Sequence, residues 1–161
     1  MKLTAYSDYA LRVLTFLAVN DDRLCTIKEI ADTYRISKNH LMKLVHELGR
    51  AGILETVRGR SGGIRLARPP QEINLGDVVR TTEDDFNIVE CFDPQTNRCV
   101  ISEACRLQFI LHEALGAFMN VLDRYTVADL LLNDQTLRRL FERPSAPLPS
   151  TGSDNTPGSQ A

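Results

Sequence analysis

The sequence predicts a mainly α-helical fold, and three observations lead to that prediction. Apolar residues recur at helical spacing in three short stretches within residues 1–50. A glycine-rich basic segment, residues 58–63, follows them between two short apolar runs. Another apolar stripe continues for about six helical turns over residues 102–125. Together they predict a winged helix-turn-helix domain followed by a cysteine-bearing loop and a long dimerisation helix.

The first helix is expected over residues 7–19, with Ser7 or Asp8 as its N-terminal cap. Its apolar positions lie three and four residues apart: Ala10, Leu11, Leu14, Leu17 and Ala18. Thr26 and Glu29 have the spacing of a capping box, which predicts a second helix running to about Tyr34. Ser37 then caps a third helix with its own apolar face, formed by Leu41, Leu44, Val45 and Leu48.

Two short helices joined by a tight turn fit a helix-turn-helix, whose second helix enters the major groove of DNA. The following hairpin, residues 53–66, carries basic residues at its glycine-rich tip and is interpreted as a wing. We expect these elements to contact double-stranded DNA through seven residues: Ser37, Lys38, Asn39, His40, Lys43, Arg58 and Arg60. The alternative is a charged surface with no ligand.

The charge distribution favours a nucleic-acid partner for the first half of the chain. Residues 1–80 carry 13 basic and 9 acidic side chains, whereas residues 81–161 carry 6 and 12. Within residues 35–68 the count is 8 basic to 2 acidic. The net charge of −2 therefore hides a basic surface suited to a polyanion.

Three of the four cysteines, Cys91, Cys99 and Cys105, lie within one polar loop of 15 residues. Soft thiolates at this spacing suit an iron–sulfur cluster or zinc, and spacing alone does not name the metal. Zinc would ordinarily require a fourth protein ligand. Cys25 lies far from the others, beside Leu24 and Ile27, and is interpreted as a small core residue.

The expected division of the chain follows these elements. Residues 1–80 form the winged helix-turn-helix domain, 81–106 the cluster-binding loop, 102–143 the dimerisation helix with a C-terminal helical segment, and 144–161 a disordered tail. A short helix is expected over residues 75–80. No apolar run approaches the roughly 18 residues that cross a bilayer, and no secretory signal opens the chain, so a cytoplasmic protein without membrane contact is expected.

An enzyme is not expected. A thiol oxidoreductase would favour a Cys-x-x-Cys pair in a βαβ context, and the sequence contains no such pair. No serine or cysteine has a base at a spacing that indicates nucleophilic catalysis. A zinc-binding winged-helix DNA-binding protein is the stronger alternative.

Several segments together resemble the NsrR/IscR family of winged-helix transcription regulators, over roughly residues 1–135. They are Leu3-Thr4, Asp8-Tyr9-Ala10-Leu11, Ser37-Lys38-Asn39-His40, the wing at 57–66, the three cysteines, and Tyr125-Thr126-Val127-Ala128-Asp129-Leu130. The resemblance implies a homodimeric repressor whose three cysteines hold an iron–sulfur cluster. The expected cluster type is 4Fe-4S, and 2Fe-2S is the alternative. Nitrosylation of that cluster by nitric oxide would release operator DNA.

The resemblance also implies a fourth cluster ligand from the partner subunit, a role that falls on Asp8. Some family members use a histidine three residues after the last cysteine, and Gln108 stands there in this chain. This favours the nitric-oxide-sensing repressors over the regulators of iron–sulfur homeostasis or redox state in the same family. The seven-residue gap between Cys91 and Cys99 is longer than the family's usual first gap.

Overall fold

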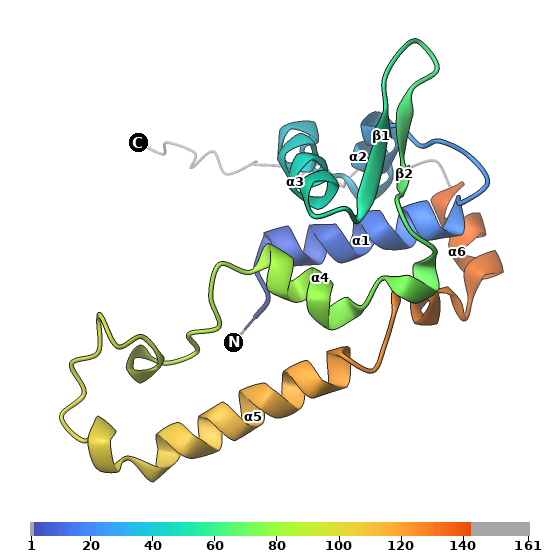
Figure 1. Ribbon diagram of the computed structural model, residues 1–161. Helices are drawn as coiled ribbons and strands as arrows, with labels where there is room; N and C mark the ends of the chain where they lie inside the picture. Colours follow the sequence, from blue (N-terminus) through green and yellow to red (C-terminus); the bar gives the residue numbers. More distant parts are fainter. Residues whose placement is uncertain (1, 143–161) are drawn as a thin grey trace, which may run out of the picture.

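The structure is a computed structural model that describes residues 2–142, so the expected tail at 144–161 lies outside the described residues. Six α-helices and one hairpin make up the part described (Figure 1). In chain order they are α1 (Ala5–Val19), α2 (Ile27–Tyr34), α3 (Lys38–Arg50), β1 (Leu54–Val57), β2 (Gly63–Leu66), α4 (Leu75–Thr82), α5 (Arg106–Leu122) and α6 (Asp134–Phe141). The mainly α winged helix-turn-helix fold is confirmed.

The core lies around α1, which contacts α2, α3, α4, β2 and α6. Ala10, Val13 and Leu14 on α1 are completely buried. They pack against apolar residues that α2 and α3 present at the predicted helical spacing, among them Ile30, Leu41, Leu44 and Leu48. Burial of these apolar faces holds three short helices together that would not be stable alone.

The start of α1 differs from the sequence prediction, which placed the cap at Ser7 or Asp8. Thr4 is the N-cap, and its hydroxyl accepts a hydrogen bond from the Ser7 amide. The Glu83 carboxylate, at the end of α4, accepts hydrogen bonds from the Thr4 amide at 2.8 Å and the Thr4 hydroxyl at 3.1 Å. α1 therefore begins earlier because Thr4 caps the helix amides locally and a residue distant in sequence holds Thr4 in place.

The wing is a two-stranded antiparallel hairpin whose register pairs Leu54 with Leu66 and Val57 with Gly63. Cys25 extends it at the base, since its amide and carbonyl exchange hydrogen bonds with Ile64 at 3.0 and 2.8 Å. The Cys25 side chain is fully buried, as expected for a core residue, and this burial raises the pKa of its thiol. The wing is thus fixed to the linker between α1 and α2.

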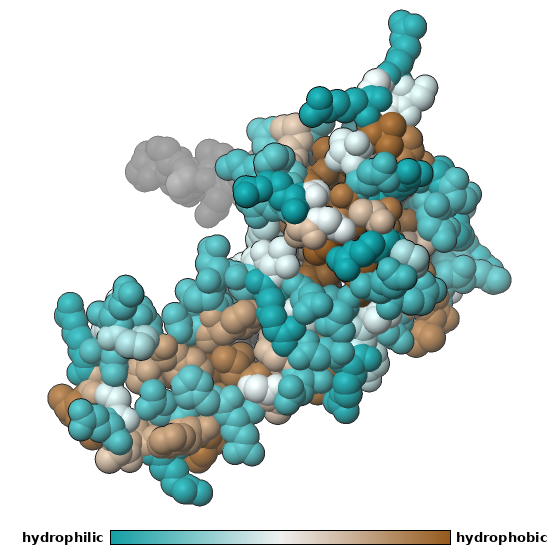
Figure 2. All heavy atoms as spheres, viewed as in Figure 1, coloured by the Kyte–Doolittle hydropathy of each residue, from teal (hydrophilic) through white to brown (hydrophobic). Residues whose placement is uncertain are grey.

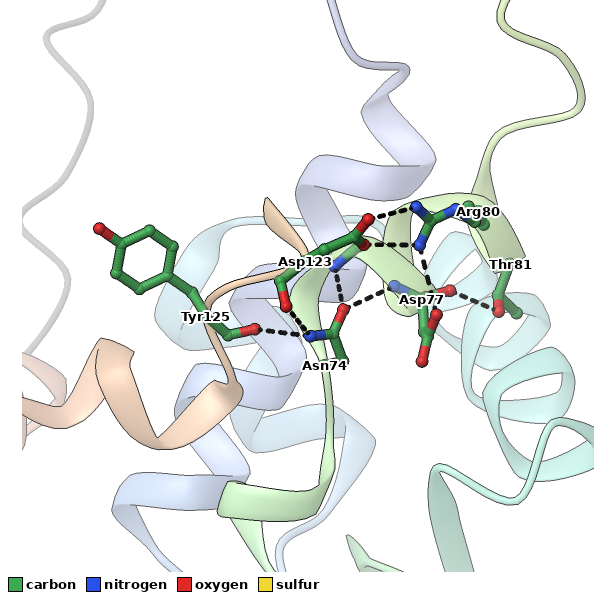
Figure 3. A network of polar contacts seen from close by, with 7 residues as sticks. Asn74, Asp77, Arg80, Thr81, Asp123 and Tyr125 are labelled. Carbon is green, nitrogen blue, oxygen red and sulfur yellow. Dashed lines mark hydrogen bonds and ion pairs between the residues drawn. The ribbon is translucent and has the colours of Figure 1, made fainter. Parts of the chain in front are cut away.

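A polar network joins α4 to the end of α5 (Figure 3). The Asn74 side chain caps α4 by accepting from the Gly76 and Asp77 amides, and it donates to the Asp123 and Tyr125 carbonyls. The two terminal guanidinium nitrogens of Arg80, Nη1 and Nη2, each donate to an oxygen of the Asp123 carboxylate at 2.7 Å. These bonds hold the pKa of the Asp123 carboxyl below its usual range.

Gly76 shows how closely the two helices approach at this network. A Cβ at this position would lie 1.9 Å from Oδ1 of Asp123 and 2.9 Å from the Arg80 guanidinium. Any side chain here would therefore displace the ion pair. The packing of α4 against the end of α5 therefore depends on glycine at position 76.

The segment after α5 returns to the first domain. The 3-10 helix η4 (Val127–Leu131) begins with a capping box formed by Thr126 and Asp129 and lies against α1. On α6, the Phe141 ring packs 5.0 Å from the ring of Phe16 and 5.7 Å from that of Tyr34, measured between centroids. The C-terminal helical segment therefore completes the core around α1, while the division of the chain into domains stays a prediction.

Candidate DNA interface and metal centre

The first candidate site is the surface formed by α3 and the wing. All seven residues predicted to contact DNA are exposed: Ser37, Lys38, Asn39, His40, Lys43, Arg58 and Arg60. The first five lie at the N-cap and in the first two turns of α3, the part of a recognition helix that reaches base edges. The other two lie in the turn between β1 and β2, where Gly59 has a φ of 116°. In Figure 1, this hairpin projects beyond the helices.

Several basic side chains of the domain are neutralised by carboxylates, whereas in the described part of the chain the four at the predicted DNA contacts are not. Arg12, Arg23, Lys28, Arg65 and Arg80 each form an ion pair with a carboxylate. Within residues 2–142, no ion pair is present for Lys38, Lys43, Arg58 or Arg60. Unpaired, exposed cations on one helix and an adjacent hairpin can bind phosphates without first breaking an internal interaction.

The second candidate site is the cysteine loop. Cys91 lies in the short 3-10 helix η2 (Glu90–Phe92), Cys99 is exposed after the turn that follows, and Cys105 is the N-cap residue of α5. All three thiols are free. The apolar stripe predicts that the long helix begins at about Ser102, but residues 102–104 form the separate 3-10 helix η3. Cys105 therefore precedes the helix instead of lying within its first turn.

The loop is closed by its own hydrogen bonds. The Arg98 amide donates to the Glu90 carboxylate at 2.7 Å and joins the two ends of the gap between Cys91 and Cys99. The Asp93 carboxylate accepts from the Gln95 amide and the Thr96 hydroxyl, which folds the residues between those ends into a turn. The long first gap is thus taken up by a compact turn.

Two side chains of α5 contact this loop. The Gln108 amide group donates to the Cys91 carbonyl at 3.0 Å. One turn further along α5, the His112 ring stacks on the Phe92 ring, with centroids 3.8 Å apart and an angle of 0° between the planes. No pattern local to α5 indicates this contact, because Phe92 lies twenty positions before His112 in the sequence.

The donor set suits a soft metal centre, since three free thiols come from one loop and one helix start. The Gln108 contact brings the backbone of Cys91 to the helix whose N-cap is Cys105. Within the part of the chain described, however, no three Cys, His, Asp or Glu side chains lie close enough together to form a metal-binding group.

Asp8, the predicted fourth ligand, lies in the first turn of α1. Its carboxylate pairs with Arg12 one turn later, with a separation of 2.7 Å between Oδ2 and the nearest guanidinium nitrogen. A second bond, from Nε of Arg12 to Oδ1, measures 3.0 Å. Asp8 is about half exposed, so it can be approached from outside the chain while remaining paired with Arg12.

One face of α5 is apolar and open. Leu107, Ile110 and Val121 are 59, 51 and 42% exposed, and of the α5 residues only Met119 is buried. These positions recur at helical spacing, so they form one stripe along the helix. Figure 2 shows apolar side chains gathered over α5 and the cysteine loop, at the lower left. No helix among residues 2–142 is long and apolar enough to cross a membrane.

Comparison with known sequences identifies regulators as relatives. A family model described as "Rrf2: Iron-dependent Transcriptional regulator" matches residues 3–133. The chain is 57% identical over 143 residues to the HTH-type transcriptional regulator NsrR of Bacillus subtilis, covering 88% of this chain and 98% of that protein. It is 55% identical over 142 residues to NsrR of Bacillus licheniformis, covering 88% and 99%.

Comparison with solved structures gives the same fold. The Staphylococcus aureus protein CymR in its oxidised form matches with a TM-score of 0.63 and 28% identity, over 79% of this chain and 93% of that one. T. potens IscR matches with a TM-score of 0.68 and 24% identity, over 86% and 91%. The latter similarity supports the fold alone.

Proposed function

Because the chain belongs to the Rrf2 family of transcriptional regulators, we propose that it is a cytoplasmic, homodimeric repressor that binds operator DNA and senses nitric oxide through an iron–sulfur cluster. Its relatives are named as regulators, and the chain is not an enzyme. The observation that carries the proposal is the placement of three free thiols on a loop docked to α5, the helix with an open apolar face.

The DNA-binding role falls on α3 and the wing. In this role the first two turns of α3 would reach base edges and phosphates from the major groove through Lys38, Asn39, His40 and Lys43, with Ser37 at the start of the helix. Arg58 and Arg60 at the wing tip would reach the adjacent minor groove or the backbone. Their exposure and lack of ion pairs in the described chain support this role.

The metal-binding role falls on Cys91, Cys99 and Cys105. These residues would hold a cluster whose iron atoms can react with nitric oxide. We propose 4Fe-4S, with 2Fe-2S as the alternative, because the resemblance to the nitric-oxide-sensing repressors implies a cluster of that type. The loop holds these cysteines through the bond between Glu90 and the Arg98 amide and through the contacts of Gln108 and His112.

A second copy of the chain completes this arrangement. The exposed apolar stripe of α5 would pair with its counterpart across a twofold axis, and Asp8 of each subunit would reach the cysteine loop of the other. Ligands from both subunits make the distance between the two recognition helices depend on the metal centre. A small change in that distance costs contacts in both operator half-sites at once.

The proposal predicts the metal content and the response to nitric oxide. Protein purified without oxygen should be brown and contain both iron and acid-labile sulfide. Nitric oxide added anaerobically should change its visible absorption and release operator DNA, measured by fluorescence anisotropy on the same sample. Colourless protein containing zinc would favour the structural zinc alternative. Unchanged operator binding by nitrosylated protein would contradict the sensor role.

Mixed dimers test the role of Asp8. One subunit carries Asp8→Ala and the other carries alanine at all three loop cysteines, so one site retains three thiols and the partner's Asp8. If Asp8 acts across the dimer, this dimer should hold one cluster with the spectrum and nitric oxide kinetics of the unchanged protein. The Asp8→Ala homodimer should hold two altered clusters.

Arg12→Ala is the matched control, because it removes the same ion pair but keeps the Asp8 carboxylate. It should leave the cluster spectrum unchanged. If Asp8→Ala and Arg12→Ala behave alike, Asp8 acts only within α1, where an acidic residue in the first turn contributes about 0.3–1 kcal/mol to stability.

A further inference from the structure

We infer that Gln108 and His112 form a docking pair that holds the Cys91 segment on α5 whether or not a cluster is bound. They are positioning residues for the metal centre, since they contact the loop and not the thiols. The inference rests on the proposed function for its consequence, but the docking itself is a property of this chain alone.

The first contact involves the backbone of the first cysteine. Gln108 donates from Nε2 to the Cys91 carbonyl over 3.0 Å, and the interaction is partly buried. The two residues are 17 positions apart, so this bond closes the whole cysteine loop. Because the carbonyl accepts the bond, the Cys91 thiol stays free to bind metal.

The second contact is the stacking of His112 on Phe92. The rings are parallel, with centroids 3.8 Å apart. Gln108 and His112 are four residues apart on α5 and therefore lie on one face, one turn from each other. They contact two consecutive loop residues, Cys91 and Phe92. Two neighbouring contacts fix the direction of the segment as well as its position.

This docking brings the first ligand to the helix that the third ligand precedes. Cys105 is the N-cap residue of α5 and lies three residues before Gln108 in the sequence. The segment of Cys91 and the residue Cys105 are therefore both attached to the N-terminal part of α5. By contrast, the hydrogen bonds of the Cys99 backbone in the part described are to Asn97 and Ser102, inside the loop. The segments of two cysteines are thus attached to α5, and the segment of the third is held within the loop.

The test is hydrogen–deuterium exchange on the full chain, reduced and free of metal. Gln108→Leu combined with His112→Ala should speed exchange of the Phe92 and Asp93 amides roughly tenfold, because undocking frees the turn in which they are bonded. Exchange in α3 and β2 should not change. Asn120→Leu, an amide-to-leucine change at an exposed α5 position, is the matched control and should have no effect.

His112→Phe separates stacking from other effects of the histidine. It keeps an aromatic ring and should preserve slow exchange of the Phe92 amide, whereas His112→Ala should not. A second measurement uses protein that holds its cluster. When the double variant and the Asn120→Leu protein start with equal iron content, a chelator should remove the cluster faster from the double variant.

The outcomes separate this inference from the proposed function. Unchanged exchange at Phe92 and Asp93 in the double variant would overturn the docking pair, whatever the iron content of the protein. Faster exchange in a protein that holds zinc or no metal would support the docking pair and reject the cluster. Faster exchange with an unchanged rate of cluster loss would show that docking does not position the metal ligands.

Discussion

Replacing Cys91, Cys99 or Cys105 by alanine is expected to reduce operator affinity to near its non-specific level, a loss of about a thousandfold or more. Each variant lacks a ligand of the proposed cluster, so the distance between the recognition helices is no longer set by the metal centre. Affinity for operator and for scrambled DNA should be measured anaerobically at one salt concentration. The variants should bind the operator more weakly than the unchanged protein does, and they should bind the scrambled sequence with the same affinity as the unchanged protein.

Cys25→Ala provides the control for these variants. Cys25 is fully buried in the core at the base of the wing, so its truncation should lower the free energy of unfolding by about 1–2 kcal/mol. Iron content and operator affinity should remain those of the unchanged protein. Tight, nitric-oxide-sensitive operator binding by a protein without the three loop cysteines would reject the cluster as the sensor.

Replacing Lys43 and Arg60 together by alanine is expected to weaken operator binding about a hundredfold while leaving iron, sulfide and visible absorption unchanged. Each side chain is exposed and without an ion pair in residues 2–142, on α3 and on the wing respectively. A base contact is worth about 1–3 kcal/mol, and each lost phosphate contact lowers the slope of log affinity against log salt by about one. Affinity at three salt concentrations distinguishes the two kinds of contact.

Arg65→Ala is the matched control on the wing. Arg65 lies on β2 and pairs with Glu55 on β1 at 2.9 Å, so its charge is already partly neutralised. Its removal should change operator affinity by less than about threefold. Equal losses from Arg65→Ala and from the Lys43 and Arg60 changes would indicate a general effect of charge instead of a DNA-contacting surface.

Elements with local signals could be predicted from the sequence. The capping box of Thr26 and Glu29 starts α2 where expected, because both of its hydrogen bonds join residues three positions apart. The wing strands follow from the glycine-rich turn between two apolar runs. The first residue of α1 could not be predicted, because Glu83 satisfies the Thr4 amide from 79 residues away.

The same distinction between local and long-range signals applies to the candidate site. Exposure of the α3 residues follows from the helical period, since the apolar residues of α3 occupy the buried face. The contacts of Gln108 and His112 with the cysteine loop join residues 17 and 20 positions apart, and no local pattern indicates them. The DNA contacts, the cluster and its fourth ligand stay predictions.

The hydrogen bond between Glu90 and the Arg98 amide has a consequence for how the loop can vary in length. It holds the two ends of the segment between Cys91 and Cys99 together, so residues 94–96 form an exposed turn outside the closed ends. Insertions or deletions there should alter the outline of the molecule without moving either cysteine, and their entropic cost rises only slowly with length. Homologous proteins can therefore differ in cysteine spacing at this gap and still present their thiols alike.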